Sequence, residues 1–502
     1  MRIKNAKRNV MYGIITYLLL MVLTFVNRRI FIDVLGQDMA GLQGLFLNLL
    51  SFLNLVESGV GIAIMFSLYT PFAEDDKEQI RSILSLYSRI YKTCGVAILI
   101  MGLVLVNFLG IFVKGQVNIE YAKIAFILYI IDTTINYFFS YKTCLLYASQ
   151  NGYLISIWDF VFKATRYIVQ ILIIFLTKSF IYFILIQLIT NVLYLIVINY
   201  VINKKFSWIN KIKPSVVKGR DNIVKNIKAL FIHKLGSFVV FSTDNILISY
   251  FLNLKTVALF TNYNMILSFC SNFTGKIFDG INPSIGNLLT EENPTKSYEV
   301  FQRIFFFNFW LSSFISISLY NTIDNFVVLW LGKQFIMDRT VLVVLLINLY
   351  ISTMRMSIDR FKESGGLYYA DRYAPFFEVI INLVFSIILV KKIGLAGVFI
   401  GTLISNLSVI FWVKPKIVFN NVFKKSFSQY LVLYIKYLVI ALIPLSLTRI
   451  AVNLLNLNYG FMDFLLNVMV NIVIINLSYL IIFKRNKELL YYKRLIIGKF
   501  KK

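Results

Sequence analysis

Residues 35–80 read LGQDMAGLQGLFLNLLSFLNLVESGVGIAIMFSLYTPFAEDDKEQI, and this stretch decides the class of fold. Between positions 43 and 70 it contains a single charged side chain, Glu57, and it then ends in the charged sequence EDDKE. A helix needs about 20 mostly apolar residues to cross a bilayer, so residues 43–70 are long enough. Long apolar runs broken by short charged segments recur along the whole chain of 502 residues. The sequence therefore predicts an all-α polytopic membrane protein.

The composition excludes a soluble protein and argues against a nucleic-acid-binding one. Hydrophobic residues make up 58% of the chain and charged residues 15%, whereas about 25% of residues are charged in soluble domains. The net charge is +27, but the basic residues lie in short segments between apolar runs. That distribution follows the positive-inside rule for inner-membrane proteins. No nucleic-acid partner is expected, because no long basic domain exists.

About fourteen transmembrane helices are expected from the apolar runs. They span residues 10–32, 43–70, 91–113, 121–148, 153–176, 180–202, 229–252, 257–287, 301–322, 339–359, 374–391, 395–418, 429–450 and 461–483. If the N-terminus is inside, 33 Lys and Arg residues fall in inner segments and 11 in outer ones. Both termini are therefore predicted to be cytoplasmic, in the bacterial cytoplasmic (inner) membrane.

The longest inner connection, residues 203–228, carries eight basic residues and suggests a linker between two helical lobes. A shift of 217 positions places Leu35, Ser51 and Glu74 on Leu252, Ser268 and Glu291, which suggests a weak internal repeat. We expect an N-terminal six-helix lobe (1–202), the linker (203–228), a C-terminal six-helix lobe (229–418), helices 13 and 14 (419–483) and a basic cytoplasmic tail (484–502). Because each lobe has an even number of helices, the two would be related by a parallel pseudo-two-fold axis. The linker should touch anionic membrane lipids.

The sequence contains no recognisable catalytic or metal-binding motif. The chain has one histidine, His233, and three isolated cysteines, and it lacks the HExxH, GxSxG and Walker signatures. The longest predicted outer loop, residues 323–338, is short and apolar, which disfavours a membrane glycosyltransferase or glycan polymerase. We therefore expect neither an enzyme nor a cofactor or metal site.

The predicted helix 153–176 carries the strongest functional signal. Its polar residues recur at intervals of three and four and therefore share one helical stripe: Ser156, Asp159, Lys163, Arg166 and Gln170. An ionised side chain near the bilayer centre costs about 2.5 to 3.5 kcal/mol, so this stripe should avoid lipid. It could be a buried ion-pair network between helices, with Asp159 and Lys163 as an i,i+4 pair. A cation-lined, water-filled cavity is favoured, because one acid cannot neutralise two bases.

Other charged residues of the predicted helices extend the candidate set. The cavity cations would be Lys163, Arg166, Lys234, Lys276 and Arg355, joined by Arg28 and Arg29 at the end of the first helix. Candidates for ion coupling are Glu57, Asp159 and Asp244, with an ordinary interface role as the alternative for Glu57 and Asp244. Structural alternatives stay open, since Lys276 could pair with Asp279, Arg355 could pair with Asp359, and lysines near helix ends can reach the membrane surface.

Residues 35–80 and two later stretches resemble bacterial polysaccharide flippases of the Wzx type. The later stretches are FSTDNILIS (241–249) with NPSIGNL (282–288), and GGLYYADRYAPFFEVIINLVFSIILVKKIGLAGVFIGTLISN (365–406). These flippases belong to the multidrug/oligosaccharidyl-lipid/polysaccharide exporter (MOP) superfamily. The resemblance implies an exporter of fourteen helices that moves an undecaprenyl-diphosphate-linked oligosaccharide to the outer leaflet by alternating access. It also implies partners among the polysaccharide polymerase and chain-length machinery.

The positive charge of the predicted cavity suits the diphosphate of such a carrier, because guanidinium and ammonium groups bind phosphate oxygens well. A cation-coupled multidrug antiporter on the same fold is the alternative. Export of cationic drugs favours acidic and aromatic side chains, whereas the candidate set here contains more bases than acids.

Overall fold

The structure is a computed structural model that describes residues 2–57, 60–113, 117–214, 217, 223, 243–289, 293–367, 370–455 and 459–500. These residues form helices, turns and bends, with no β-strand in any of the described ranges. Nine helices of this described part are long and apolar enough to cross a membrane. The prediction of an all-α, multi-pass membrane protein is therefore confirmed, while the count of fourteen spans stays a prediction.

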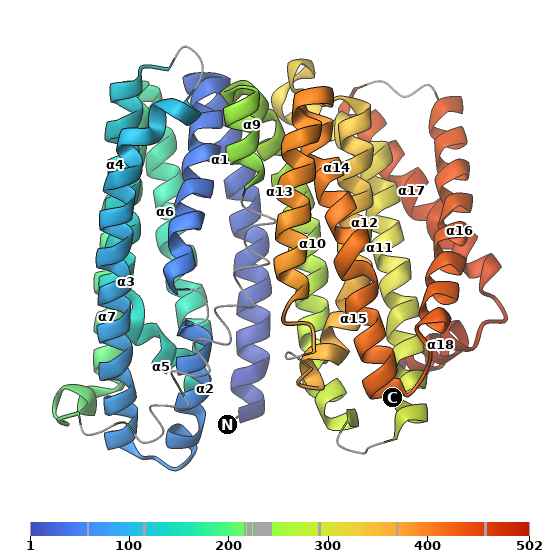
Figure 1. Cartoon of the computed structure of the whole chain (residues 1–502), viewed down its shortest axis with the longest axis horizontal. Coiled ribbons are helices and arrows are strands. Elements are labelled where there is room, and N and C mark those ends of the chain that lie inside the picture. The colour runs from blue at the N-terminus through green and yellow to red at the C-terminus, as the bar shows by residue number, and fades with distance from the viewer. Residues whose placement is uncertain are drawn as a thin grey trace. The chain divides into compact units, whose positions relative to one another are not determined.

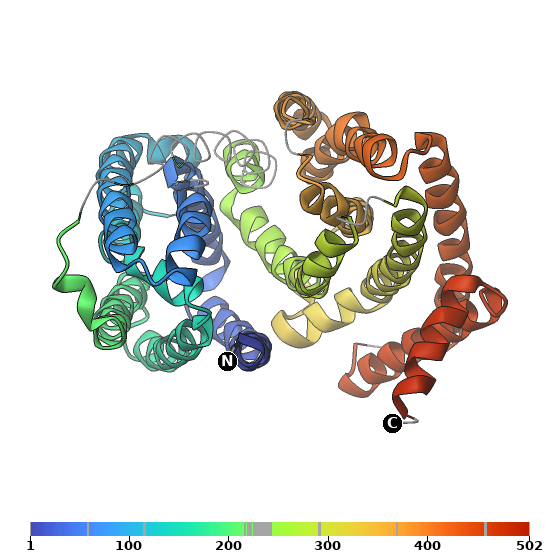
Figure 2. The same cartoon turned by 90° about the horizontal axis from the view of Figure 1, so that it is seen from below.

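The chain divides into two compact units, Met1–Ala258 and Leu259–Lys502, which are described separately (Figure 1). The lobes predicted at 1–202 and 229–418, and their pseudo-symmetry, remain predictions. Figure 2 shows the helices of each unit nearly end-on.

Unit 1 is a bundle of helices in which α1 packs on α6, α3 on α4, and α7 on both α4 and α6. Its elements are α1 (Arg2–Leu53), η1 (Asn54–Glu57), α2 (Val60–Ala73), α3 (Lys77–Phe112), α4 (Ile119–Phe139), η2 (Ser140–Lys142), α5 (Thr143–Ala148), α6 (Gly152–Thr177), α7 (Phe180–Lys205), η3 (Ser207–Asn210) and α9 (Asp244–Phe251). The start of α10 (Leu254–Leu289) completes this unit.

Two glycines shape α1. Gly36 has φ 84° and divides α1 into two legs, so that the predicted helices 10–32 and 43–70 follow each other across a sharp bend. Glycine adopts this positive φ without the steric cost that other residues incur. At Gly41 an added Cβ would overlap the carbonyl oxygen of Leu254, so the second leg of α1 and the start of α10 make backbone contact. A side chain at position 41 would separate them.

Unit 2 packs around a large cluster of aromatic side chains. Its elements are the rest of α10, α11 (Pro294–Leu331), η4 (Lys333–Phe335), α12 (Arg339–Ser364), α13 (Ala374–Ile393), α14 (Leu395–Ser405), η5 (Asn406–Ile410), α15 (Phe411–Val418), η6 (Phe419–Phe423), α16 (Phe427–Leu454), α17 (Phe461–Ile482) and α18 (Lys487–Phe500). The rings of Phe309 on α11 and Tyr437 on α16 are stacked, with centroids 4.5 Å apart and planes 11° apart. The cluster thus joins α16 to the rest of the unit.

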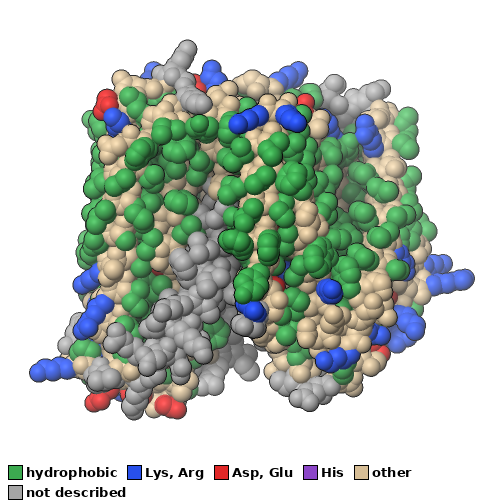
Figure 3. Space-filling model, in the orientation of Figure 1, with side chains coloured by type: hydrophobic (Ala, Val, Ile, Leu, Met, Phe, Trp, Pro, Cys, Tyr) green, Lys and Arg blue, Asp and Glu red, His purple; other side chains and the backbone are tan. Residues whose placement is uncertain are grey.

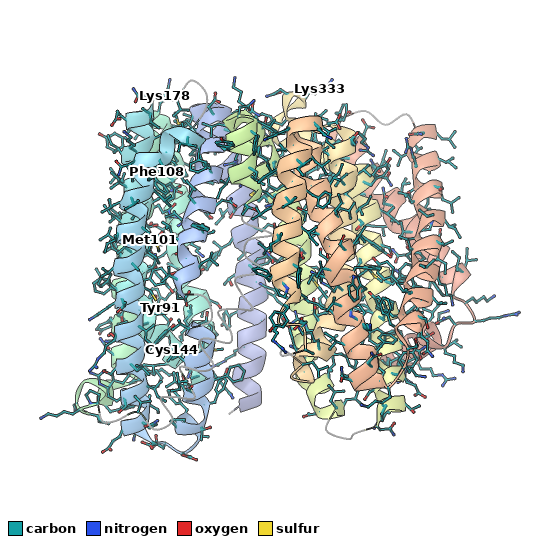
Figure 4. The ribbon with its side chains drawn as sticks, viewed as in Figure 1. Tyr91, Met101, Phe108, Cys144, Lys178 and Lys333 are labelled. Atoms are coloured by element: carbon teal, nitrogen blue, oxygen red, sulfur yellow. The ribbon has the colours of Figure 1, made fainter. Side chains whose placement is uncertain are left out.

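Large hydrophobic side chains stay exposed over much of both units, as expected for surfaces that face lipid. On the face drawn in Figure 3 they cover most of the height of each unit, while Lys and Arg gather mainly toward its two ends. Tyr91, Met101 and Phe108 follow one another along α3 in Figure 4, with Lys178 near the upper edge of unit 1. Half of the Phe108 side chain is exposed.

Several helix boundaries agree with the predicted spans, and the disagreements have physical causes. Helices α6 and α17 match the predicted runs 153–176 and 461–483 to within a residue. Helix α3 begins at Lys77, well before the expected position 91, because Asp76 caps its N-terminus and the first turns bury one apolar face. The predicted helix 395–418 is interrupted by the π-helical segment η5, and a second one, η6, directly follows it. Most of the predicted helix 229–252 lies outside the described residues.

Candidate functional site

The polar stripe of α6 borders a cavity inside unit 1. This cavity has a volume of about 270 Å³ and lies between α4, α6 and α7. Its lining is rich in charged and amide side chains: Asp132, Asn136, Asp159, Phe162, Lys163, Arg166, Thr190, Asn191 and Tyr194. Of the stripe predicted from the sequence, the structure thus brings Asp159, Lys163 and Arg166 together around one cavity.

Lys163 and Asp159 form the i,i+4 ion pair that was one of the two interpretations of the stripe. Lys163 Nζ lies 2.9 Å from Asp159 Oδ2, and the side chains are 42% and 34% exposed. The pair is therefore not a sealed buried bridge, and both charges can reach a ligand or water in the cavity. The ion pair and the cavity are thus both present.

Arg166 is the residue of this cavity whose hydrogen-bonding capacity is least used. Its buried Nε has no hydrogen-bond partner among the described residues. Its guanidinium carbon lies 5.0 Å from the centroid of the Tyr167 ring, in cation–π range. A buried donor without a partner carries a free-energy cost that an anionic acceptor in the cavity would remove.

Asp132 on α4 brings a second carboxylate to the cavity. It accepts hydrogen bonds from Gln187 Nε2 at 2.9 Å and from Asn191 Nδ2 at 2.6 Å, both on α7. The α6 stripe has one acid and two bases, but the lining of the cavity contains two acids and two bases. Gln170, at the end of the stripe, is fully buried and donates to the carbonyl of Phe183 at 3.0 Å. It has a structural role between α6 and α7.

Arg28 and Arg29 differ in their surroundings. Arg28 is buried, and its Nη1 donates to Gln43 Oε1 at 2.9 Å across the two legs of α1. Gln43 Nε2 in turn donates to the hydroxyl of Tyr129 on α4 at 3.3 Å. Arg28 therefore ties the bend of α1 to α4. Arg29 lies 3.7 Å from Asp33 in an exposed i,i+4 pair.

Glu57 is the last residue of η1, and aromatic side chains surround it. The hydroxyl of Tyr91 donates to Glu57 Oε1 at 2.6 Å, and the rings of Tyr87 and Tyr91 lie 4.2 Å apart. The hydroxyl of Tyr137 donates to the neighbouring Asn54 at 3.0 Å. Glu57 therefore stays a candidate for ion coupling.

Asp244 begins α9 and is buried, and its Oδ1 has no hydrogen-bond partner among the described residues. Lys234 and His233, which precede α9, lie outside the described residues, so the structure does not place them. Asp244 therefore keeps its predicted role as a candidate for ion coupling.

In unit 2, Arg355 belongs to a charge network whose other members come from three helices. Arg355 Nε lies 3.4 Å from Asp359 Oδ2, its Nη1 donates to Asn406 Oδ1 at 2.7 Å, and Lys414 Nζ lies 2.9 Å from Asp359 Oδ1. The Arg355–Asp359 pair is the structural alternative considered for these residues, and Asn406 opens the π-helical segment η5. Lys276 is exposed on α10, and Asp279 pairs with Arg360 at 2.9 Å.

Lys414 and Glu378 are two charged residues of this region that were not predicted as site residues. Lys414 lies within α15, inside the predicted helix 395–418, and contacts Asp359. Glu378, Asn382 and Ser386 recur every four residues on α13 and are all buried. The same test for a polar stripe that singled out α6 would have found them.

The comparisons with known proteins identify the fold. The chain is similar to the solved structure of the lipid II flippase MurJ in an inward closed conformation, with a TM-score of 0.72, 12% identity and coverage of 94% of this chain and 98% of that one. It has the fold of the MOP transporters. A MATE transporter of Vibrio cholerae, VcmN, gives a TM-score of 0.59 at 14% identity, covering 84% of this chain and 98% of that chain.

A multidrug resistance MATE transporter of the MOP superfamily, in an inward-facing conformation, gives a TM-score of 0.60 at 16% identity, with coverage of 81% and 98%. No protein-family model and no curated protein sequence matches the chain. The Wzx-type resemblance thus finds structural support at the level of the superfamily fold.

Proposed function

We propose that this chain is a flippase that moves an undecaprenyl-diphosphate-linked oligosaccharide across the bacterial cytoplasmic membrane by alternating access, in polysaccharide biosynthesis. The observation that carries this proposal is the cavity of unit 1, where Arg166 offers an unpartnered donor beside the ammonium group of Lys163. Two features support it further: the Wzx-type sequence stretches, and the likeness in fold to a protein described as a lipid II flippase.

Arg166 lies near the middle of α6. It lies fourteen residues after Gly152, about 21 Å along a helix that rises 1.5 Å per residue. At that depth a cation has no bulk water, so it needs an anion or a wet cavity. A guanidinium can donate two parallel hydrogen bonds to the oxygens of a diphosphate, and an ammonium group attracts the same oxygens as a compact positive charge. Asp132 and Asp159 would then balance the site when the substrate has left.

The two carboxylates of the same cavity favour a second candidate function. Asp132 and Asp159 border the cavity beside Phe162 and Tyr194. Acidic and aromatic side chains together suit an organic cation. A cation-coupled multidrug antiporter is therefore the alternative, and it has the same fold.

The remaining predictions complete the proposal. Both termini and the linker 203–228 would lie in the cytoplasm, and the linker would contact anionic lipids. Glu57, Asp159 and Asp244 would be the groups available for coupling to an ion gradient. Polysaccharide polymerase and chain-length proteins would be partners. The protein would act as a transporter without enzymatic activity.

Deletion of the protein and analysis of lipid-linked sugars tests the proposal. A flippase mutant should accumulate the lipid-linked oligosaccharide on the inner leaflet, and the wild-type chain should restore export. Arg166→Gln should fail to restore it, whereas Lys178→Gln should succeed, because Lys178 is the exposed residue that ends α6 outside the cavity. Intact glycan export together with altered sensitivity to cationic drugs would instead identify the antiporter.

A further inference from the structure

The C-terminal helix α18 has the composition of a helix that lies on a membrane surface. It follows α17 after a short turn and lies at the lower end of unit 2 in Figure 1. On its inner side Leu489 is buried, and the hydroxyl of Tyr492 donates to the carbonyl of Arg303 on α11 at 3.1 Å. These contacts hold α18 against α11, so α18 is part of the fold and not a loose basic tail.

The outer side of α18 mixes apolar and basic residues. Leu490, Tyr491 and Leu495 are 40%, 37% and 47% exposed, and Lys487 and Arg494 are exposed on the same arc of the helix. Exposed apolar side chains among Lys and Arg are typical of helices in the interface between headgroups and acyl chains. In water this surface would be unfavourable, whereas at a membrane both classes of side chain find partners.

A cavity of about 400 Å³ lies between α18 and α11 and contains three bases. Its lining is Glu299, Gln302, Arg303, Lys487, Glu488, Leu490, Tyr491 and Arg494. Arg303 lies 3.8 Å from Glu299, and its guanidinium carbon lies 4.3 Å from the centroid of the Tyr491 ring. Lys487 and Arg494 make no ion pair with any described residue. The three bases of the lining outnumber its two acids, so the cavity has a net positive charge.

The position of this cavity fits the headgroup level of the bilayer. Arg303 lies nine residues after Pro294, the first residue of the membrane-crossing helix α11, which is about 14 Å along the helix. Helix α18 directly follows α17, so the end of α17 lies at the same end of unit 2 as α18. Helices α16 and α17 run antiparallel, so the start of α16 lies there too (Figure 1). Positive groups at the cytoplasmic surface attract anionic lipids within about a Debye length.

We propose that the cavity between α11 and α18 binds the headgroup phosphate of an anionic phospholipid of the surrounding leaflet. Arg303, Lys487 and Arg494 would donate to the phosphate oxygens, and Leu490, Tyr491 and Leu495 would contact the upper acyl chains. This site is independent of the transported substrate and lies outside the cavity of unit 1. Bound lipid would stabilise the docked position of α18.

Lipid binding to the purified full-length protein tests this inference. Delipidated protein in detergent should retain phosphatidylglycerol in native mass spectrometry and unfold at higher temperature with it, whereas phosphatidylcholine and inorganic phosphate should give neither effect. Each basic residue at an anionic surface contributes about fivefold in affinity. The triple variant Arg303→Gln, Lys487→Gln, Arg494→Gln should therefore bind phosphatidylglycerol at least tenfold more weakly.

A matched triple variant controls for net charge. Lys333 in η4 and Lys391 and Lys392 in the last turn of α13 are exposed and lie outside both α18 and the linker, so their change to glutamine removes the same charge elsewhere. Tyr492→Phe removes the hydroxyl contact to α11 without removing a base, so it reports on docking of α18 alone. Equal binding by the wild-type and the Arg303, Lys487, Arg494 variant would overturn the inference, as would an equal loss in the control triple. Preferential binding of undecaprenyl diphosphate that phosphatidylglycerol cannot displace would assign the cavity to the substrate and overturn the phospholipid assignment.

Discussion

Replacing Lys163 and Arg166 together by glutamine separates a structural role of the α6 stripe from a role in ligand binding. The Lys163–Asp159 distance is 2.9 Å, but the side chains are 42% and 34% exposed. An i,i+4 ion pair with such exposure stabilises a fold by only about 0.3 to 0.5 kcal/mol. The buried Nε of Arg166 has no hydrogen bond to lose among the described residues. The free energy of unfolding should therefore fall by less than about 1 kcal/mol.

The effect on transport should be much larger. A hydrogen bond to a charged group contributes about 1.5 to 3 kcal/mol, which corresponds to a loss of roughly tenfold to more than a hundredfold in affinity for each base that contacts the diphosphate. Arg166→Lys should keep part of the activity, because the charge survives while the bidentate geometry of the guanidinium is lost.

Two measurements on the same variants distinguish a structural role of these residues from a role in binding the substrate. Thermal unfolding in detergent gives the change in stability, and the lipid-linked oligosaccharide that accumulates in a deletion strain gives the loss of export. Normal export by a stable Lys163→Gln, Arg166→Gln protein would refute the assignment of the cavity to the substrate. If Asp159→Asn instead unfolds the protein as readily as Lys163→Gln, and the double change restores stability, then the pair is structural.

Three further predictions concern topology and stability. In a cysteine-free background, Lys211→Cys should react with a membrane-impermeant reagent only after the cells are opened; labelling of intact cells would reverse the predicted orientation. Asn471→Leu should destabilise unit 2 by about 1 kcal/mol, because Asn471 on α17 is fully buried and accepts from Asn321 Nδ2 on α11 at 2.7 Å; no change in thermal unfolding would contradict this. The N–H groups at the start of α12 donate to Asp338 and lower the pKa of its carboxyl, so its contribution to stability is complete above the ordinary pKa of Asp and is lost as the pH falls through the lowered value. The stability difference between wild type and Asp338→Asn should therefore be constant at neutral pH and shrink in acid, and a difference that grows in acid would show the wrong sign.

The sequence predicted most helices well where apolar runs end at charged or turn residues. Helix α6 is such a case, since Asn151 precedes it and Lys178, with φ 50°, ends it. The predicted boundaries are wrong where a helix continues through a polar segment. At the start of α3, Ile80, Ile83, Leu84 and Tyr87 are buried on one face although charged residues surround them in sequence. Charged residues alone do not mark the start of this helix, because its first turns are amphipathic. The spacing of the apolar residues by three and four does reveal these turns.

The site residues on α6 could be predicted from the sequence because they lie on one helix. The site residues on other helices could not, because their positions depend on how the helices pack together. Asp159, Lys163 and Arg166 share a helical face, which spacing reveals. Asp132 joins them only because α4 packs against α7, and Lys414 meets Asp359 only because α15 packs against α12. Contacts between helices far apart in sequence leave no trace in the spacing of a single helix.

A stripe of polar residues within the membrane is weak evidence for a ligand unless its hydrogen bonds are incomplete. On α17, Asn467 and Asn471 form such a stripe, but Asn471 Nδ2 donates to Asn467 Oδ1 at 2.8 Å and Asn467 Nδ2 donates to the carbonyl of Asn321 at 2.8 Å. These amides satisfy one another and join α17 to α11, with no need of a ligand. Arg166 differs, because its buried donor lacks a partner among the described residues and borders a cavity. The hydroxyls of Tyr350 and Tyr434, beside a cavity in unit 2, also lack partners within the described part of the chain, but they are neutral and the lining of that cavity is mostly apolar. An unsatisfied donor that carries a positive charge and has space beside it, and not polarity alone, is therefore what favours α6 as the helix that would hold the substrate.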